Sequence, residues 1–309
     1  MGIARNRMAL RHVVRSPVRF FVGLVLAAAA ALCVAVIGVG LLLSWPAAGA
    51  IGAPPADLVA ERVAMISASG ATLRGWFLAG RPGGGVIVLM HGVRANRLSM
   101  VQRARMLHES GFAVLLFDFQ AHGESSGKRI TFGHLEALDA AAAVAFVKQR
   151  LPNEKIGAIG TSLGGAAALL GPTPLPVDAL VLEAVYPDIG AATANRIRAV
   201  LGSPIGSFVA PPLTRAFELL MPPILGVASG DLRPIDHVAD VVAPLMIVSG
   251  TRDTRTTARE TIAMFDRARE PKSLWLVEGA GHVDLENYAP DAYRAHVLAF
   301  LAGTLQQRR

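Results

Sequence analysis

Residues 160–164 read Gly-Thr-Ser-Leu-Gly, a pattern in which a serine stands between two glycines at the end of an apolar run. The preceding residues 155–159 favour a strand, and the alanine-rich residues 164–170 favour a helix. The glycines allow a sharp turn between strand and helix, and such a turn holds the serine hydroxyl above the edge of a sheet. The stretch therefore predicts an alternating α/β fold in which Ser162 is an exposed nucleophile.

An acid and a histidine follow Ser162, and each comes directly after an apolar strand candidate. Asp253 lies just past residues 244–250, and His282 lies just past residues 274–281. Serine, acid and histidine in this order are typical of α/β-hydrolases, whereas the chymotrypsin and subtilisin types use other orders. On these residues the chain resembles the α/β-hydrolase superfamily from about residue 62 to its end. It is similar in particular to bacterial serine-aminopeptidase-like and dienelactone-hydrolase-like serine hydrolases.

Two further segments carry the same resemblance. Residues 86–92, Val-Ile-Val-Leu-Met-His-Gly, are similar to the family's third strand and the His-Gly turn that follows it. Residues 115–125 are similar to the family segment Asp-x-x-Gly-His-Gly-x-Ser, but they carry Gln120-Ala121 where an Arg-Gly or similar pair is usual. That segment shapes the site without taking part in chemistry, so we expect the departure to affect the shape of the pocket.

The resemblance implies a fold class and a set of catalytic roles. The implied fold is the α/β-hydrolase fold, a mostly parallel central sheet with helices on both faces and a cap insertion. His282 is the expected base for Ser162, and Asp253 is expected to orient its imidazole. The backbone N–H groups of Val93 and Leu163 are the expected oxyanion hole. We expect no metal and no organic cofactor in this reaction.

The catalytic acid has a competitor in the sequence. Glu183 ends the strand candidate 179–183, and some members of the fold carry the acid after this earlier strand. Asp253 fits the commoner position, because it follows the next strand candidate in Gly-Thr-Arg-Asp. Asp253 is therefore the predicted acid and Glu183 the alternative.

Other polar residues near these motifs are expected to be structural. His91 and His122 occupy family positions that shape turns. Arg94 and Asn96 lie just beyond residues 91–93, which are called the oxyanion turn below. They either stabilise the loop that follows or face the substrate, and the structural interpretation is favoured. Asp284, two residues after the predicted base, is expected to make a local hydrogen bond.

The N-terminal region predicts a membrane anchor. Residues 1–19 form a basic tail with five arginines and no acid, and residues 20–43 carry no charge. About 20 apolar residues span a bilayer, and basic residues on one side only place the N-terminus in the cytoplasm and the hydrolase domain outside it. The alternative is a cleaved signal peptide, because residues 48–50 (Ala-Gly-Ala) resemble a cleavage site. The apolar run is longer than the usual h-region of about 7–15 residues, which favours a single-pass protein of the cell membrane.

The net charge of +7 comes mostly from this tail. Without its five arginines, 25 of the 30 basic residues remain against 23 acidic ones, so the charge does not indicate a nucleic-acid partner. The only cysteine, Cys33, lies inside the predicted anchor, so the globular part has no cysteine with which to form a disulfide.

The remaining chain predicts one domain with a cap. Residues 44–61, rich in Ala, Gly and Pro, predict a linker, and residues 62–309 predict the hydrolase domain. Residues 62–66 and 72–77 predict an opening β-hairpin. Residues 187–241 interrupt the alternation of strands and helices with seven prolines and many large apolar side chains. Such side chains are rarely left in water, so the segment predicts a cap over the active site.

The predicted function is that of a membrane-anchored serine hydrolase acting on carboxylic esters or related small-molecule acyl compounds. A peptidase or amidase of the serine-aminopeptidase type is the alternative among enzymes, since the same triad serves both. A non-catalytic binding protein that retains the fold is disfavoured by the intact Ser162, Asp253 and His282. A haloalkane dehalogenase is disfavoured because it needs a carboxylate in place of Ser162. The acyl group and the oligomeric state are left open.

Overall fold

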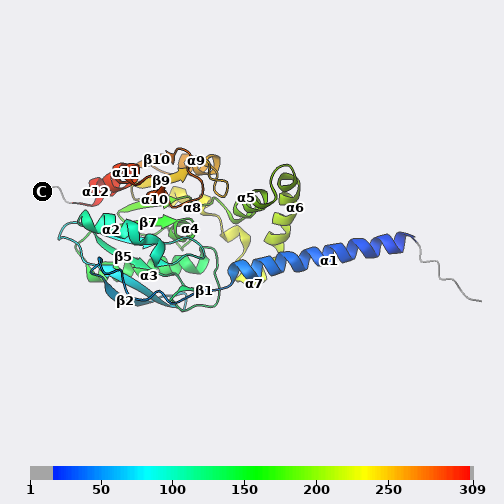
Figure 1. The fold of residues 1–309 in the computed structure, drawn as a ribbon, viewed down its shortest axis with the longest axis horizontal. Coiled ribbons are helices and arrows are strands. Elements are labelled where there is room, and N and C mark those ends of the chain that lie inside the picture. The colour runs from blue at the N-terminus through cyan, green and yellow to red at the C-terminus, as the bar shows by residue number, and fades with distance from the viewer. Residues whose placement is uncertain (1–16, 307–309) are drawn as a thin grey trace, which may run out of the picture.

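A single eight-stranded sheet forms the centre of the computed structural model, which describes residues 17–306 (Figure 1). Its strands are β2 (Glu61–Ile66), β3 (Thr72–Leu78), β4 (Val86–Met90), β5 (Ala113–Phe117), β7 (Ile156–Thr161), β8 (Ala179–Glu183), β9 (Leu245–Gly250) and β10 (Lys272–Val277). They are arranged in the order β10-β9-β8-β7-β4-β5-β3-β2. β3 pairs antiparallel with β2 and β5, and the other neighbours pair parallel. The expected mostly parallel sheet is confirmed, and the predicted hairpin is β2–β3.

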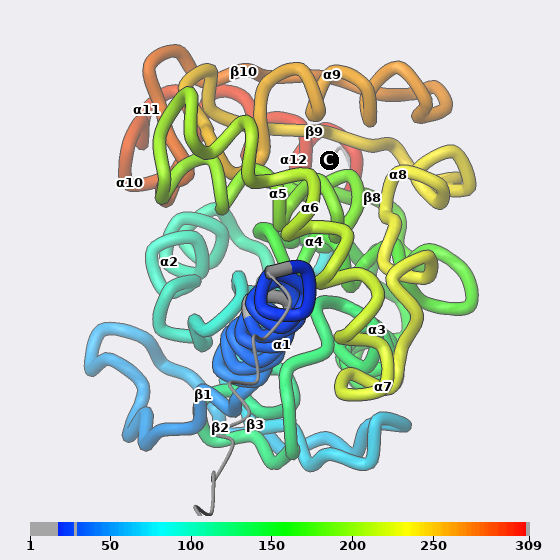
Figure 2. The backbone as a smooth tube through the Cα atoms, turned by 90° about the vertical axis from the view of Figure 1, so that its right-hand side faces the viewer, coloured from blue at the N-terminus to red at the C-terminus, as the bar shows by residue number. Residues whose placement is uncertain are grey.

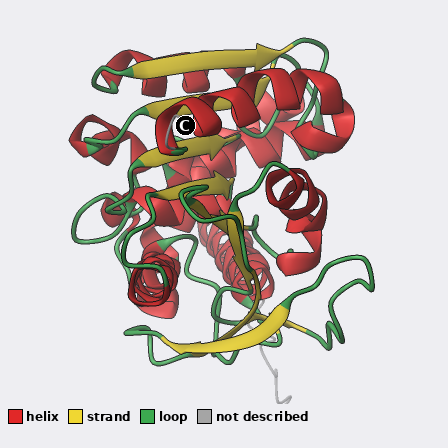
Figure 3. Ribbon diagram, turned by 90° about the vertical axis from the view of Figure 1, so that its left-hand side faces the viewer, coloured by secondary structure: helices red, strands yellow, loops and turns green. Residues whose placement is uncertain are grey.

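Helices cover both faces of this sheet (Figure 3). They are α2 (Val101–Glu109), α3 (His134–Arg150), α4 (Leu163–Leu169), α9 (Ala258–Arg267), α10 (Leu285–Tyr288), α11 (Pro290–Tyr293) and α12 (Ala299–Leu305), with a 3₁₀ turn at Arg97–Met100 and a π turn at Arg294–Leu298. One buried apolar cluster joins the sheet to α3, α4 and α9, and a second joins it to α2, α11 and α12. Val88 of β4 belongs to the first cluster and Leu89 to the second. Burial on both faces explains why such strands are continuously apolar.

The chain between β8 and β9 forms a mostly helical cap, as the sequence predicts. It contains α5 (Ile189–Leu201), α6 (Ile205–Leu220), α7 (Pro222–Leu225) and α8 (Pro234–His237), with 3₁₀ turns at Ser229–Asp231 and Val238–Asp240. Much of the cap is held together by a small apolar cluster of its own, which includes Ile189, Phe217 and Met221. This cluster explains the apolar composition of the insertion.

Helix α1 (Pro17–Ser44) projects from the body beside the cap (Figures 1 and 2). It is long and apolar enough to cross a membrane, whereas residues 1–16 of the basic tail lie outside the described residues. Val36 packs against the apolar cluster of the cap, and Gly40 lies against the side chain of Met221. The predicted linker begins with a short strand, β1 (Ala47–Ala48), which pairs parallel with β6 (His122–Gly123). This pairing fixes the end of α1 to the body of the α/β domain.

Candidate active site

Ser162 lies on a strained turn between β7 and α4. Its backbone has φ 51°, an uncommon conformation for a residue with a side chain. A Cβ at Gly160 would lie 2.5 Å from the amide nitrogen of Gly165, and one at Gly164 would lie 2.3 Å from the carbonyl oxygen of Met90. Glycine is therefore required at both positions that flank the serine. The turn presents Ser162 at the N-terminus of α4, as the pattern predicts.

A small cavity of about 70 Å³ lies directly at this turn. Its lining comes from the turn at Ser162, called the elbow below, and from the loop after β4, the loop before α3, the cap and the end of α1. It consists of Leu43, Val93, Arg94, Phe132, Ser162, Leu163, Tyr186, Ile189, Ala192, Thr193, Arg196 and Phe217. Most of these side chains are apolar. The cavity thus brings the predicted nucleophile together with both residues predicted to form the oxyanion hole.

The backbone N–H groups of Val93 and Leu163 are available to a ligand. Within residues 17–306, neither of these two groups donates a hydrogen bond to another protein atom. Leu163 is the first residue of α4, where an N–H group has no acceptor within the helix. Two free donors beside a serine hydroxyl can stabilise an oxyanion that forms between them.

Asp253 and His282 form a hydrogen-bonded pair after β9 and β10. The Nδ1 atom of His282 lies 2.8 Å from Oδ2 of Asp253. The same carboxylate accepts hydrogen bonds from the amides of Arg255 and Thr256 and from the Thr256 hydroxyl, at 2.7–2.9 Å. Burial alone would raise the pKa of the Asp253 carboxyl, but the bond from His282 and the Thr256 donors outweigh it and hold the pKa below its usual value. Asp253 is therefore an anion that fixes the His282 ring.

No hydrogen bond joins the Ser162 hydroxyl to His282 in the described part of the chain. Both residues stand at the carboxyl ends of strands in the same half of the sheet, on β7 and after β10. Hydrogen bonds between catalytic groups are often long or absent without substrate and tighten in the complex. The structure thus holds the Asp253–His282 pair and the turn at Ser162 separately, without a hydrogen bond between them.

His91 and His122 hold the oxyanion turn, as the resemblance implies. His91 accepts a hydrogen bond from the Phe119 amide at Nε2 (3.1 Å), and its Nδ1 lies 2.7 Å from the Gly92 carbonyl oxygen. His122 accepts from the Arg94 amide at Nε2 (3.1 Å), next to Val93. Burial is the main cause that lowers the pKa of His91 to about 3, and the nearby His122 is the second cause. Burial also lowers the pKa of His122. Both rings are therefore neutral and serve as fixed supports.

Arg94 and Asn96 have different roles within the loop that follows. The side-chain oxygen of Asn96 accepts a hydrogen bond from the Leu98 amide and caps a 3₁₀ turn, so its structural interpretation holds. Arg94 lines the cavity, and its Nη1 donates to the carbonyl oxygens of Leu42 (3.2 Å) and Trp45 (3.1 Å). Arg94 thereby ties the end of α1 to the oxyanion turn, a contact that no sequence pattern indicates.

Glu183, the alternative acid, is engaged elsewhere. It is fully buried and accepts hydrogen bonds from Arg103 (Nη2 to Oε2, 2.9 Å), from the Tyr293 hydroxyl and from the Thr161 hydroxyl (2.8 Å). Its backbone carbonyl accepts from the Ser162 amide at 2.7 Å. No bond to His282 exists among the described residues. Glu183 therefore supports the elbow from below, whereas Asp253 holds the histidine.

Arg103 connects Glu183 to the loop that carries His282 and Asp284. Its guanidinium is buried and also pairs with Asp284 at 2.9 Å. The Asp284 carboxylate accepts hydrogen bonds from the amides of Glu286 and Asn287 and caps α10. The structural role expected for Asp284 is thus present, but its main partner, Arg103, lies far away in the chain.

The unusual pair Gln120-Ala121 does not reach the pocket, so the expectation that it affects pocket shape is wrong. The Gln120 amide group donates to the Glu136 carboxylate at 2.9 Å. Ala121 adopts φ 57°, a conformation that a glycine would adopt more easily. Neither residue lines the cavity that contains Ser162. Gln120 instead binds the start of α3, and the Ala121 carbonyl oxygen accepts a hydrogen bond from the Ala47 amide at 2.8 Å.

Arg196 is a cavity residue that sequence reasoning missed. It is half-buried on α5, and its Nη1 donates to the backbone carbonyl of Ala192 at 3.0 Å. It forms no ion pair with a carboxylate in the described part of the chain. Burial is the main cause that lowers the pKa of Arg196 from its ordinary high value, and the neighbouring Arg255 is the second cause. No motif surrounds it in the sequence, and only the position of α5 reveals it.

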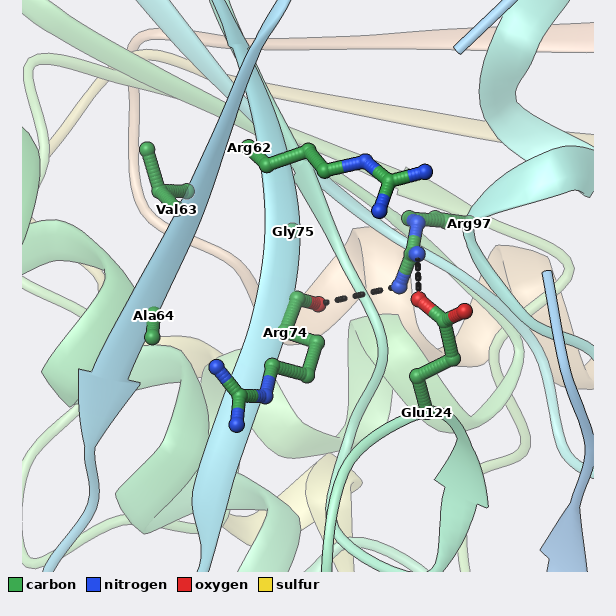
Figure 4. Close-up of a pocket in the computed structure, with 7 residues that line it drawn as sticks. All are labelled: Arg62, Val63, Ala64, Arg74, Gly75, Arg97 and Glu124. Atoms are coloured by element: carbon green, nitrogen blue, oxygen red, sulfur yellow. Dashed lines mark hydrogen bonds and ion pairs between the residues drawn. The ribbon is translucent and has the colours of Figure 1, made fainter. Parts of the chain in front are cut away.

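A second hollow of about 330 Å³ lies beside β2 and β3 (Figure 4). It is lined by Arg62, Val63, Ala64, Arg74, Gly75, Arg97 and Glu124. It is larger than the cavity at Ser162, but it contains no predicted catalytic residue, and Arg97 and Glu124 are paired with each other. We therefore place the chemistry at the smaller cavity. Within the described residues no three His, Cys, Asp or Glu side chains are grouped to hold a metal.

Comparison with known proteins agrees with the α/β-hydrolase fold. Residues 87–296 match the alpha/beta hydrolase family. The uncharacterized protein YqkD of Bacillus subtilis is 25% identical over 247 residues, which cover 78% of this chain and 79% of YqkD. An uncharacterized Mycobacterium tuberculosis protein is 27% identical over 250 residues, covering 79% of this chain and 80% of the relative. The structure of the Pyrococcus furiosus esterase Pf2001 matches with a TM-score of 0.70 and 25% identity, covering 85% of this chain and 98% of the esterase.

Proposed function

Because the chain belongs to the alpha/beta hydrolase family, we propose that it is a membrane-anchored serine hydrolase that cleaves carboxylic esters through an acyl-enzyme intermediate. The observation that carries this proposal is that Ser162, held at φ 51°, shares one apolar cavity with the free amides of Val93 and Leu163. The hydrogen-bonded pair Asp253–His282 supplies a base held in a fixed orientation. The likeness to an esterase favours esters as substrates.

The first half of the reaction acylates the serine. The Ser162 oxygen attacks the ester carbonyl while Nε2 of His282 takes its proton. Asp253 accepts the Nδ1–H bond of His282 and stabilises the imidazolium that results. The amides of Val93 and Leu163 receive the negative charge that develops on the carbonyl oxygen. The C–O bond then breaks, and the alcohol leaves with the proton that His282 returns.

The second half frees the enzyme. Water loses a proton to His282 and attacks the acyl carbonyl, and the same two amides receive the oxyanion. The bond to Ser162 breaks, the serine oxygen regains the proton, and a carboxylic acid leaves. The sum is ester plus water giving acid plus alcohol, for which no metal or organic cofactor is required.

The anchor is proposed to stay attached to the enzyme. Cleavage after Ala50 would remove Leu43 from the cavity lining. It would also remove the carbonyl groups of Leu42 and Trp45, to which Arg94 donates. A signal peptide is removed from the mature protein, so it is not expected to supply residues to the active site. These contacts support an uncleaved α1. The proposal that the hydrolase domain lies outside the cytoplasm rests on the basic tail alone.

A substrate screen of the full-length protein in detergent tests the function. We expect hydrolysis of p-nitrophenyl esters, measured across acyl chain lengths, and much slower hydrolysis of aminoacyl p-nitroanilides. The ester activity is expected to disappear in Ser162→Ala. Faster cleavage of the amides would make the protein a peptidase or amidase, and no hydrolysis of either class would refute the proposal.

A further inference from the structure

The membrane helix forms part of the active-site cavity. Leu43 of α1 and Phe217 of α6 both line the space that contains Ser162. Closer to the N-terminus, Val36 packs against the cap cluster, and Gly40 lies against Met221 at the end of α6. The wall of the cavity therefore continues along the line where α1 meets the cap.

The length of α1 places the contacts between α1 and the cap at the edge of the bilayer. From Phe20 to Ala35 the described side chains of α1 are exposed, and this stretch measures about 24 Å at about 1.5 Å per residue. A hydrocarbon core is about 30 Å thick. About four more residues are needed to cross it, which brings Val36 and Gly40 to the boundary of the core. The first contacts between α1 and the cap thus lie at the membrane surface.

The cap exposes apolar side chains beside this boundary. Ile205, Phe208, Pro212 and Leu219 are exposed, and their spacing puts them on one stripe of α6. The side chain of Phe208 is 85% exposed and that of Ile205 is 61% exposed. Residues 199–214 carry no charge at all. A surface helix normally turns such a stripe inward, and an outward apolar stripe marks a site of interaction.

Helices α5 and α6 lie on the face of the molecule from which α1 emerges. Figure 1 shows them beside the projecting helix, and Figure 2, in which α1 points toward the viewer, shows them next to its axis. A membrane crossed by α1 would therefore meet this part of the cap. The exposed apolar stripe of α6 is continuous with the apolar surface of α1. The lipid of the membrane that α1 crosses is therefore the partner that fits this stripe.

We propose that the cap dips into the leaflet next to the hydrolase domain and that the substrate is an ester lipid of that leaflet. This inference rests on the proposed function, because it needs both a spanning α1 and the Ser162 nucleophile. The cavity of about 70 Å³ is far smaller than the roughly 300–1,000 Å³ of sites that enclose a whole small molecule. It has room for the ester group, while the hydrocarbon chain stays in the bilayer.

The chemistry of such a substrate balances without any further reactant. The lipid's acyl–oxygen bond breaks as Ser162 takes the acyl group, and the alcohol portion leaves with the serine proton. Water then releases the acyl group as a carboxylic acid. Both products are amphiphiles or small polar molecules that can return to the leaflet or to water.

Insertion of the cap is tested without any catalytic readout. Phe208→Cys is labelled with the environment-sensitive fluorophore NBD in a Cys33→Ala background, in the full-length protein reconstituted into phosphatidylcholine vesicles. We expect a blue-shifted emission that is quenched by nitroxide-labelled lipid. The matched control is Ile66→Cys, at a 78% exposed apolar position on β2, the edge strand farthest from the β8 and β9 ends that carry the cap. It is expected to emit as in water. Water-like emission at position 208 would overturn the proposal.

Substrate supply is tested with two esters of one fluorogenic alcohol. 4-Methylumbelliferyl palmitate is embedded in the vesicles, and the acetate is dissolved in water. Ile205→Asp combined with Phe208→Asp is expected to lower the palmitate rate at least about tenfold, since two large side chains lose their burial in lipid. The acetate rate is expected to stay unchanged, and Ile66→Asp is expected to change neither rate.

The outcomes separate this inference from the proposed function. An unchanged palmitate rate in the double variant, or an equal loss of both rates, would overturn the lipid-uptake role of the cap while leaving the esterase intact. Absence of hydrolysis in the parent protein, with NBD at position 208 still inserted, would refute the esterase and with it the lipid substrate.

Discussion

Two buried carboxylates near Ser162 have separate roles because their partners differ. Glu183 faces the guanidinium of Arg103 at 2.9 Å and holds the elbow through Thr161. Asp253 faces neutral donors and the Nδ1 atom of His282. A carboxylate that is already paired with an arginine stabilises an imidazolium less than an unpaired carboxylate does. The carboxylate that binds His282 is therefore the one that is not paired with an arginine.

Exchanging each carboxylate for its amide separates the two roles. Asp253→Asn is expected to keep the fold and lower kcat by roughly 10⁴-fold, because the amide favours the wrong tautomer of His282. Glu183→Gln is expected to change kcat far less but to destabilise the protein by about 3 kcal/mol, since Arg103 stays buried without its full partner. Steady-state kinetics and denaturant unfolding measure the two effects. A larger kcat loss for Glu183→Gln would move the acid to the earlier strand.

The sequence carries the residues of the proposed triad but not their supports. Ser162, Asp253 and His282 can be predicted because each follows an apolar strand in a recognisable order. The links from Arg103 to Glu183 and from Arg94 to Leu42 join residues far apart in the chain and have no local pattern. The choice between Asp253 and Glu183 likewise depends on partners that only the folded chain brings together.

At the scale of the element, the turn between β7 and α4 depends on close backbone approach. β7 and α4 meet so tightly that a methyl group at Gly160 would lie 2.5 Å from the Gly165 nitrogen. Backbone atoms cannot move aside as a flexible side chain can. The turn is therefore an element whose sequence is set by contact distance rather than by helix or strand propensity.

Substitution of that glycine tests how the elbow is built. Gly160→Ala is expected to lower the free energy of unfolding by about 1–3 kcal/mol through overpacking, and to reduce activity by displacing Ser162. Gly230→Ala is the matched control, because no atom lies within 4 Å of its Cβ, and we expect a change within about 0.5 kcal/mol. Denaturant titrations of the three proteins give the comparison. Equal stabilities would show that the turn relaxes freely.

The strands could be predicted from the sequence because burial on both faces requires continuous apolar runs. The cap could be predicted because prolines and large apolar side chains interrupt the alternation of strands and helices. The pairing of β1 with β6 could not, since two residues in an apparent linker carry no strand signal. The packing of α1 on the cap was hidden for another reason. An apolar helix has the same composition whether lipid or protein covers it, so Val36 and Gly40 look like any other anchor residues.

At the scale of the whole molecule, the anchor and the enzyme form one structure. The end of α1 is fixed by Arg94, by the Ile130 amide, which donates to the Ser44 carbonyl oxygen at 2.8 Å, and by the pairing of Ala47 with His122. The cavity at Ser162 is therefore held at a set distance from the apolar helix α1. An enzyme on a loose tether would lack this constraint.

The proposed membrane topology is tested in cells. The full-length protein is expected to stay in the membrane pellet after carbonate washing, and protease added to spheroplasts is expected to digest residues beyond about 50. Immunoblotting against each end of the chain follows both results. A soluble form beginning near Ile51 would identify a signal peptide, and a protected hydrolase domain would reverse the orientation.

The most direct test of the central claim is to find the residue that becomes covalently modified. A fluorophosphonate reacts with an activated serine, and peptide mass spectrometry locates the adduct. We predict one adduct on the full-length protein, at Ser162, prevented by Ser162→Ala and strongly slowed by Asp253→Asn. Labelling that persists in Ser162→Ala, or an adduct on another residue of the parent protein, would contradict the assignment of Ser162 as nucleophile.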